Sequence, residues 1–324
     1  MLRDGPKYNI KWTLFLFCLV TIFLTSIGME ANQMNDDEIK GILYFSNGAN
    51  LIKYDFSTKK KEIIFQQGEK SELGKKITNI TYPVYLKSKN RILFLGMTPY
   101  PYHNYIFESD LDLKNMKQYR KVNNIDALSL SPDESMIAYN RHPNKLAIKQ
   151  YDDLENDGSG ERTLADNLFS PTLWLSNTEL IYGSTDNAVV KVNMQRNEQQ
   201  ILIKNAFCGS VSPNGTHILA FFSSNKTSYS YIYLYELSSS KWRVIIKGSK
   251  QQVSSPEIWS PDEKYFIFTK LRGLKFTFNI RKLWNDLVAS LEERHDLYIY
   301  SLATGEEKKI IEDEVTRGGF WLKE

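Results

Sequence analysis

A short phrase built on Ser-Pro recurs along the chain, and this repeat limits what the chain can fold into more than any other feature. The clear copies are Leu130–Asp133, Val211–Asn214 and Trp259–Asp262, and the degenerate ones are Tyr85–Ser88 and Trp174–Asn177. Proline followed by Asp or Asn favours a tight turn. An apolar run of β-forming residues, such as Tyr265–Phe268, follows each copy. The interval of roughly 37–48 residues matches one blade of a β-propeller.

A second phrase ends each unit and sets the number of blades. It pairs two strands around a polar turn, and its copies include Lys53–Thr58, Leu234–Ser239 and Ile299–Gly305. Divided into four-stranded units, the 324 residues contain six. The first unit, from Gly41, lacks its opening strand, whereas Gly318–Leu322 is a surplus strand at the C-terminal end. The sequence therefore predicts an all-β fold, a six-bladed β-propeller of four-stranded blades that the C-terminal strand closes in the first blade.

These phrases resemble the WD40-like repeat of the TolB-like six-bladed propellers. In that family a Trp-Ser-Pro-Asp-Gly turn precedes an apolar strand and an Asp-Gly-Ser hairpin, and here Trp259–Asp262 and Asn156–Glu161 match it. The resemblance covers about residues 41–322, although Glu134 and Glu263 replace the usual Gly and two units lack the Pro. It implies the fold. It also implies an extracytoplasmic interaction module, since family members look like such modules and some stand beside hydrolase domains in peptidases.

The first 30 residues have the pattern of an N-terminal membrane or signal helix. Arg3, Lys7 and Lys11 precede the apolar stretch Trp12–Ile27, whose length lies between a signal-peptide core and a full membrane span. A signal anchor and a cleaved signal peptide both stay open. Positive charge before the stretch places the rest of the chain outside the cytoplasm, either membrane-anchored or secreted. The predicted divisions are residues 1–30 as signal anchor or signal peptide, 31–40 as linker and 41–324 as propeller.

Composition indicates an exported protein of bacterial type and gives no sign of nucleic-acid binding. The net charge is +3 and the basic residues are dispersed, so no basic block of nucleic-acid type is present. After the apolar stretch, Cys208 is the only cysteine, which leaves no internal disulfide. A disulfide-poor exported chain rich in Lys, Asn and Ile is typical of a bacterial cell surface.

The sequence predicts no catalytic residue, metal site or cofactor. It has no Gly-x-Ser-x-Gly, and six blades use up the exported part, so a separate hydrolase domain has no room. The four histidines lack the mutual spacing of metal ligands; they are His103, His142, His217 and His295. The Asp and Glu residues fall mostly in predicted turns, where hydrogen bonding to the backbone explains them.

Two departures from the repeat mark a candidate binding surface. The sixth unit carries an insertion, residues 274–295, whose apolar residues fall at helical spacing and predict an inserted helix. These apolar residues are Ile280, Leu283, Trp284, Leu287, Val288 and Leu291. We expect this helix to pack on the propeller's own face or on a partner. The second unit carries a loop rich in Tyr and Pro, Thr98–Tyr105, which either packs on itself or contacts a partner.

Both departures belong to connections that propeller topology places on one face, where function tends to lie. The predicted partner-binding residues are Tyr100, Tyr102, His103, Tyr105, Phe276, Phe278 and Trp284. The leading hypothesis is a non-enzymatic extracytoplasmic propeller that binds a protein or cell-envelope component through this face. One alternative is an envelope-associated enzyme, a hydrolase or lyase, with its site in the central channel. The other is a structural or sensory subunit of a membrane complex.

Overall fold

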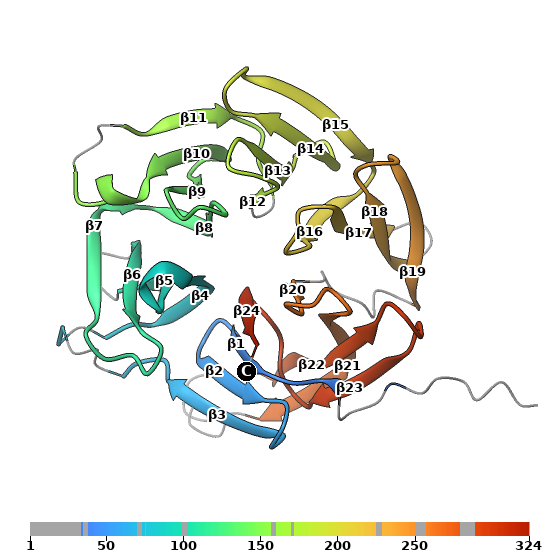
Figure 1. Cartoon of the computed structure of the whole chain (residues 1–324). Helices are drawn as coiled ribbons and strands as arrows, with labels where there is room; N and C mark the ends of the chain where they lie inside the picture. Colours follow the sequence, from blue (N-terminus) through green and yellow to red (C-terminus); the bar gives the residue numbers. More distant parts are fainter. Residues whose placement is uncertain are drawn as a thin grey trace, which may run out of the picture.

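The protein is a ring of six blades around a central axis (Figure 1). The computed structural model describes residues 34, 38–69, 73–74, 76–98, 103–156, 160–169, 172–224, 229–249, 257–278 and 289–323. Within these residues the chain forms six four-stranded antiparallel sheets and no α-helix, with the short 3₁₀ turns η2 (Lys87–Lys89) and η3 (Tyr151–Asp153) beside the strands. The predicted all-β, six-bladed propeller of four-stranded blades is therefore confirmed.

Each blade is a meander whose innermost strand lies beside the axis (Figure 1). From inner to outer strand, blade 1 is β24 (Gly319–Leu322), β1 (Ile42–Ser46), β2 (Leu51–Asp55) and β3 (Lys60–Phe65). Blade 2 is β4 (Asn79–Leu86), β5 (Arg91–Met97), β6 (Asn104–Asp110) and β7 (Lys117–Asn123). Blade 3 is β8 (Ile125–Leu130), β9 (Met136–Arg141), β10 (Lys145–Gln150) and β11 (Arg162–Ala165).

The remaining blades follow the same order. Blade 4 is β12 (Leu173–Trp174), β13 (Glu179–Gly183), β14 (Ala188–Asn193) and β15 (Glu198–Lys204). Blade 5 is β16 (Phe207–Val211), β17 (His217–Ser224), β18 (Tyr229–Glu236) and β19 (Lys241–Ser249). Blade 6 is β20 (Ile258–Trp259), β21 (Tyr265–Phe278), β22 (Ala289–Ser301) and β23 (Glu307–Ile311).

The C-terminal strand β24 lies beside β1 as the inner strand of blade 1, so the first blade contains both ends of the propeller sequence. Trp321 pairs with Leu43, stacks on Phe56 with 4.2 Å between ring centroids, and donates its indole N–H to the Lys40 carbonyl at 3.0 Å. At the start of the strand, Ser46 exchanges backbone hydrogen bonds with Arg317 and Gly318.

Six apolar clusters fill the six interfaces between neighbouring blades, so each blade is buried on both sides. In β21, for example, Ile267 belongs to the cluster with blade 1, whereas Phe266 and Phe268 belong to the cluster with blade 5. This two-sided burial explains why the strands are continuous apolar runs and do not alternate with polar residues.

The Ser-Pro turns join blades as well as strands. In the turn of blade 3 the Ser131 hydroxyl donates to Asp133 at 2.7 Å and accepts from the Met136 amide at 2.9 Å. Glu134, in the position usual for Gly, adopts a left-handed φ of 61°, and its carboxylate accepts the backbone N–H groups of Lys87 and Ser88 in blade 2. Gly would adopt this left-handed φ without strain. Glu134 instead contributes a side chain that forms hydrogen bonds to the neighbouring blade.

Glu263 repeats this arrangement between blades 6 and 5. It also has a φ of 61°, and its carboxylate accepts a hydrogen bond from the backbone N–H of Asn214 at 2.6 Å. The two departures from the family's Gly thus have the same structural reason.

The predicted inserted helix over 274–295 is wrong at both of its ends. Residues 274–278 continue β21 and residues 289–295 continue β22, and the two strands stay paired out to Phe278 and Ala289. Antiparallel pairing of β21 with β22 extends both strands. A helix here would be destabilised, because basic residues near its N-terminus and acidic residues near its C-terminus interact unfavourably with the helix dipole. Residues 279–288, with Trp284, lie outside the described residues, as does the N-terminal segment 1–30. None of the helical turns in the described part has the length and apolarity that a membrane span requires.

Candidate functional site

A central cavity of about 920 Å³ runs between the inner strands of all six blades. Its lining is largely apolar and aromatic. Residues from each blade contribute, among them Tyr82, Leu128, Trp174, Phe207, Trp259 and Phe320. Among the described residues of the lining, Glu257 is the only Asp, Glu, Lys, Arg or His.

The cavity has two different ends because the inner strands all run in the same direction along it. Each strand begins after a connection from the previous blade, and each except β24 ends at a Ser-Pro turn or its equivalent. We call the face with the connections between blades the inter-blade face; it also carries the turns between the second and third strands. Glu257 and Phe207 lie at the starts of inner strands toward this face, whereas Pro132, Pro213 and Pro261 line the opposite end.

Aromatic side chains form one wall of the cavity near the inter-blade face. The Phe169 side chain is 65% exposed, although its backbone is fixed by a hydrogen bond from its N–H to the Gly183 carbonyl at 2.8 Å. Its ring lies 5.4 Å from the ring of Phe207, and Phe207 pairs with Phe221 across β16 and β17. The cavity therefore has an exposed aromatic side chain at this end.

Glu257, just before the inner strand of blade 6, places a carboxylate in the lining at this same end of the cavity. Its backbone N–H donates to Ile267, and its Oε2 accepts the Gly318 amide at 2.8 Å. Burial raises the pKa of Glu257 to about 7, against the lowering effects of Thr316, the Gly318 N–H and the Arg317 charge. At neutral pH this carboxyl is therefore present in both protonation states.

Tyr82 lies in the lining beside β24. It has a left-handed φ of 51°, and its N–H donates to the Arg317 carbonyl at 2.7 Å at a bulge in β4 between Thr81 and Val84. Burial, together with the negative charge of Glu257, raises the pKa of Tyr82 to about 12. The phenol therefore stays protonated at physiological pH and is available as a hydrogen-bond donor.

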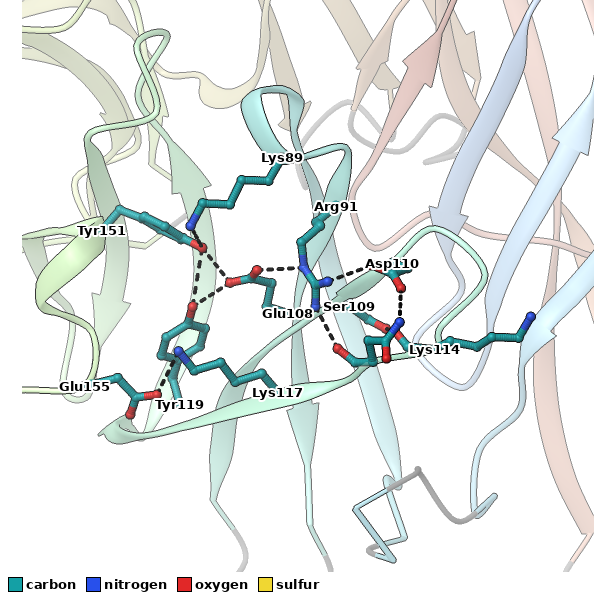
Figure 2. A network of polar contacts seen from close by, with 11 residues as sticks. Lys89, Arg91, Glu108, Ser109, Asp110, Lys114, Lys117, Tyr119, Tyr151 and Glu155 are labelled. Carbon is teal, nitrogen blue, oxygen red and sulfur yellow. Dashed lines mark hydrogen bonds and ion pairs between the residues drawn. The ribbon is translucent and has the colours of Figure 1, made fainter.

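A second buried carboxylate, Glu108, lies between blades 2 and 3 and has a different environment (Figure 2). The hydroxyls of Tyr119 and Tyr151 both donate to its Oε2, and Arg91 Nε lies 2.7 Å from its Oε1. Arg91 also pairs with Asp110 at 2.6 Å. Burial alone would raise the pKa of Glu108, but the two tyrosine hydrogen bonds and the Arg91 charge bring it below its ordinary value. This network of an ion pair and two hydroxyl donors is a structural junction between blades.

The described part of the chain contains four of the seven predicted partner-binding residues. Tyr100, Tyr102 and Trp284 lie outside it. The rings of His103 and Tyr105 make a perpendicular contact with 6.2 Å between centroids, and Tyr105 packs against the core between blades 1 and 2. Phe276 and Phe278 lie on the extension of β21, toward the inter-blade face.

Sequence reasoning missed Glu257, Phe169 and Tyr82, although one signal for Glu257 was present. Aligned on the repeated phrase, Glu257 stands two residues before Trp259, and the corresponding residues of other units are uncharged. They are Leu128, Thr172, Gly209 and Gly319. A carboxylate at a repeat position where these four units have uncharged residues is a signal that singles out Glu257. No group of three or more His, Cys, Asp or Glu residues suited to a metal ion occurs in the residues that the structure describes.

Comparison with known proteins establishes the fold. No protein-family model matches the chain, and no curated protein matches it. Solved structures do match. A structure assigned to TolB of Agrobacterium tumefaciens superposes with a TM-score of 0.58 at 12% identity, covering 86% of this chain and 90% of that one. TolB of Acinetobacter baumannii gives 0.61 at 13% identity, covering 87% of this chain, which spans 66% of that protein.

A third similar structure is that of a nidogen/laminin complex, with a TM-score of 0.59 at 9% identity, covering 86% of this chain and 97% of that one. At these identities the similarity concerns the fold, a six-bladed propeller of the TolB-like type.

Proposed function

We propose that this TolB-like propeller is a non-enzymatic binding module that works outside the cytoplasm and holds part of a protein or cell-envelope partner at its inter-blade face. The observation that carries this proposal is the central cavity with its exposed aromatic wall. Its volume of about 920 Å³ lies within the range of ligand pockets, which are mostly apolar with a few placed polar groups.

The rigidity of the scaffold supports binding by this cavity. Every inner strand is held in a four-stranded sheet, and the blades are packed on both sides, so the lining is formed before a ligand arrives. A preformed pocket binds with a smaller loss of conformational entropy. The two predicted departures from the repeat, Thr98–Tyr105 and the extension of β21 and β22, belong to the same face and would enlarge the contact area.

The N-terminal segment 1–30 supports an extracytoplasmic location, since its charge pattern places the propeller outside. If the segment is retained, the partner meets a tethered propeller; if it is cleaved, the propeller is secreted. Sequencing the N-terminus of the purified protein distinguishes the two forms.

Substitution of Phe169 tests the proposed function. Partner capture is measured after crosslinking in cells, with the wild type, Phe169→Ala and the control Trp242→Ala, whose side chain is 61% exposed on the outer strand of blade 5. We expect Phe169→Ala to reduce specific capture about tenfold, as for an aromatic residue at the centre of an interface. Trp242→Ala should bind like the wild type. Equal capture by all three proteins would contradict binding through the cavity.

A combined Tyr100→Ala, Tyr102→Ala, Trp284→Ala variant tests the wider face in the same assay. A further loss of capture, without a lower melting temperature, would extend the binding surface to these residues.

A second candidate function is an enzyme, a hydrolase or lyase, with its site in the channel. The observation that favours it is Glu257, because a carboxyl with a pKa of about 7 can exchange protons near neutral pH. Turnover of an envelope polymer that is lost in Glu257→Gln and retained in Glu198→Gln would select this candidate.

A further inference from the structure

We propose that the central cavity recognises a positively charged group carried on an apolar body, and that Glu257 binds the charge. This inference rests on the proposed binding function and names the chemistry of the ligand. On a protein partner the matching groups are a Lys or Arg side chain flanked by apolar residues, or an N-terminal ammonium group.

The first argument is the isolation of the carboxylate. Glu257 is the only ordinarily charged residue among the described residues that line the cavity. Arg317 lies near enough to lower its pKa, yet in the described part of the chain the two side chains form no ion pair. Tyr82 is also near Glu257, but its phenol is neutral and supplies no cation. The negative charge of Asp126 acts on Tyr82 as well. A partly buried carboxylate without a paired cation is costly, so a ligand that supplies the cation gains binding energy there.

The second argument is the character of the remaining lining. Phe169, Phe207 and Phe221 form an aromatic wall, and Leu173 and Ile258 add aliphatic surface. The methylene groups of a Lys or Arg side chain bury well against such surface while the charged end reaches a polar group. An aromatic face is also attractive to a cation within about 6 Å. An anionic ligand would find no cationic side chain among the described residues of this lining.

Protonation of Glu257 should compete with the ligand. The pKa of the free carboxyl is about 7, so the binding form is the minor form at pH 6 and the major form at pH 8. Affinity for a cation should therefore rise about tenfold between pH 6 and pH 8, and binding at pH 7 should release protons. A ligand whose binding does not involve this carboxylate would not show this dependence.

Four short peptides test the inference by isothermal titration calorimetry on the purified propeller. Three are blocked at both ends and differ at the centre: Phe-Lys-Phe, Phe-norleucine-Phe and Phe-Glu-Phe. The fourth is Phe-norleucine-Phe with a free N-terminal amine, which separates a side-chain cation from an N-terminal one. At pH 7, where a free α-amino group is still mostly protonated, we expect one of the two cationic peptides to bind at least tenfold more tightly than the blocked norleucine peptide, and the Glu peptide to bind most weakly.

Variants assign the effect to Glu257. Glu257→Gln keeps the shape of the side chain and an acceptor for the Gly318 N–H, and it should abolish both the preference for the cation and the pH dependence. Glu198→Gln, at a carboxylate that is 69% exposed on the outer strand of blade 4, should keep both. The pH series of the wild type tests the same point without any substitution.

The outcomes separate the two proposals. Equal binding of the norleucine and cationic peptides overturns the role of Glu257. A preference for the cation that persists in Glu257→Gln overturns it too. Both outcomes leave the proposed binding function standing. Tightest binding of the Glu peptide also overturns the inference. Failure of all four peptides to bind overturns a peptide partner in the cavity, and the inference fails with it.

Discussion

Two carboxylates of this propeller, Glu108 and Glu257, show how the same side chain can serve a fold or a site. Glu108 is 6% exposed and is surrounded by Arg91 and the hydroxyls of Tyr119 and Tyr151 (Figure 2). Glu257 faces the central cavity with one backbone N–H at 2.8 Å and no paired cation in the described residues. The pKa of Glu108 lies below its ordinary value, and that of Glu257 is raised to about 7.

The difference lies in what each blade contributes around the carboxylate. At Glu108, two blades supply a cation and two hydroxyl donors, so ionisation stabilises the folded state. At Glu257, the blades supply mainly apolar side chains and leave a cavity, so ionisation is unfavourable without a paired cation. A satisfied buried charge therefore indicates a structural junction, and an unsatisfied one beside a cavity indicates a binding site.

The largest test asks whether these two regions belong to one cooperative unit. Deletion of residues 316–324 removes Gly318, whose N–H donates to Glu257, and β24 with the buried Trp321 of blade 1. Loss of one buried Trp side chain alone costs about 3–5 kcal/mol, and the free edge of β1 adds to this. Since whole domains are stable by only about 5–15 kcal/mol, we expect the truncated propeller to unfold throughout, as measured by thermal unfolding followed by circular dichroism.

The region around Glu108 shows whether unfolding caused by the truncation extends to blades that do not contact β24 through this network. It lies in blades 2 and 3, apart from β24, and hydrogen exchange of the backbone amides of β6 and β7 follows it. A truncated protein that keeps this signal and melts at the full-length temperature would show that the blades are independent, and would contradict closure of the ring by β24.

The next largest effect is expected at Glu108 itself. Glu108→Gln keeps the volume of the side chain but leaves Arg91 with Asp110 as its carboxylate partner and weakens two tyrosine hydrogen bonds. Loss of a buried charge partner should lower the free energy of unfolding by about 2–4 kcal/mol, measured in urea at pH 7. Glu198→Gln, at an exposed carboxylate, should change it by less than about 0.5 kcal/mol. Equal effects of the two substitutions would remove the distinction between a junction and a surface charge.

The sequence predicted the architecture because the repeat is a property of local physical chemistry. Ser-Pro-Asp turns and apolar runs, such as Trp259–Asp262 followed by Tyr265–Phe268, define one unit, and six units follow from the spacing. The helix predicted over 274–295 is wrong in its described parts, because apolar periodicity within one segment takes no account of pairing with a neighbouring strand. Pairing of β21 with β22 supplies cross-strand hydrogen bonds that override helical spacing.

The candidate site was harder to predict because its residues are distant in sequence and meet at the axis. Phe169 precedes blade 4, Glu257 precedes β20 and Tyr82 lies in β4, and none belongs to the repeated phrase. The Glu257 environment depends on Gly318, 61 residues away. The cavity appears only when the ring is assembled, so residue spacing along one blade cannot indicate it.

The smallest expected effect has the opposite sign and tests the comparison most sharply. The pKa of Glu257 in the folded protein is about 7, above the ordinary value of 4.5, so between these values the folded state binds more protons than the unfolded one. The stability associated with this group is therefore fully present below pH 4.5 and is lost as pH rises through 7. Glu257→Gln should raise the free energy of unfolding of the ligand-free protein at pH 8 by about 1–3 kcal/mol, since one pKa unit corresponds to about 1.4 kcal/mol.

Urea unfolding at pH 5, 6, 7 and 8 measures this difference between wild type and Glu257→Gln. The gain should grow with pH across the series, whereas Glu108→Gln should be destabilising by nearly the same amount at every pH, because the pKa of Glu108 in the folded protein lies below its ordinary value and the carboxylate stays ionised from pH 5 to 8. A Glu257→Gln protein that is less stable than the wild type at pH 8 would mean that the carboxylate is paired in the folded state. Glu257 would then be a structural junction like Glu108, and the cavity would lose its charged recognition group.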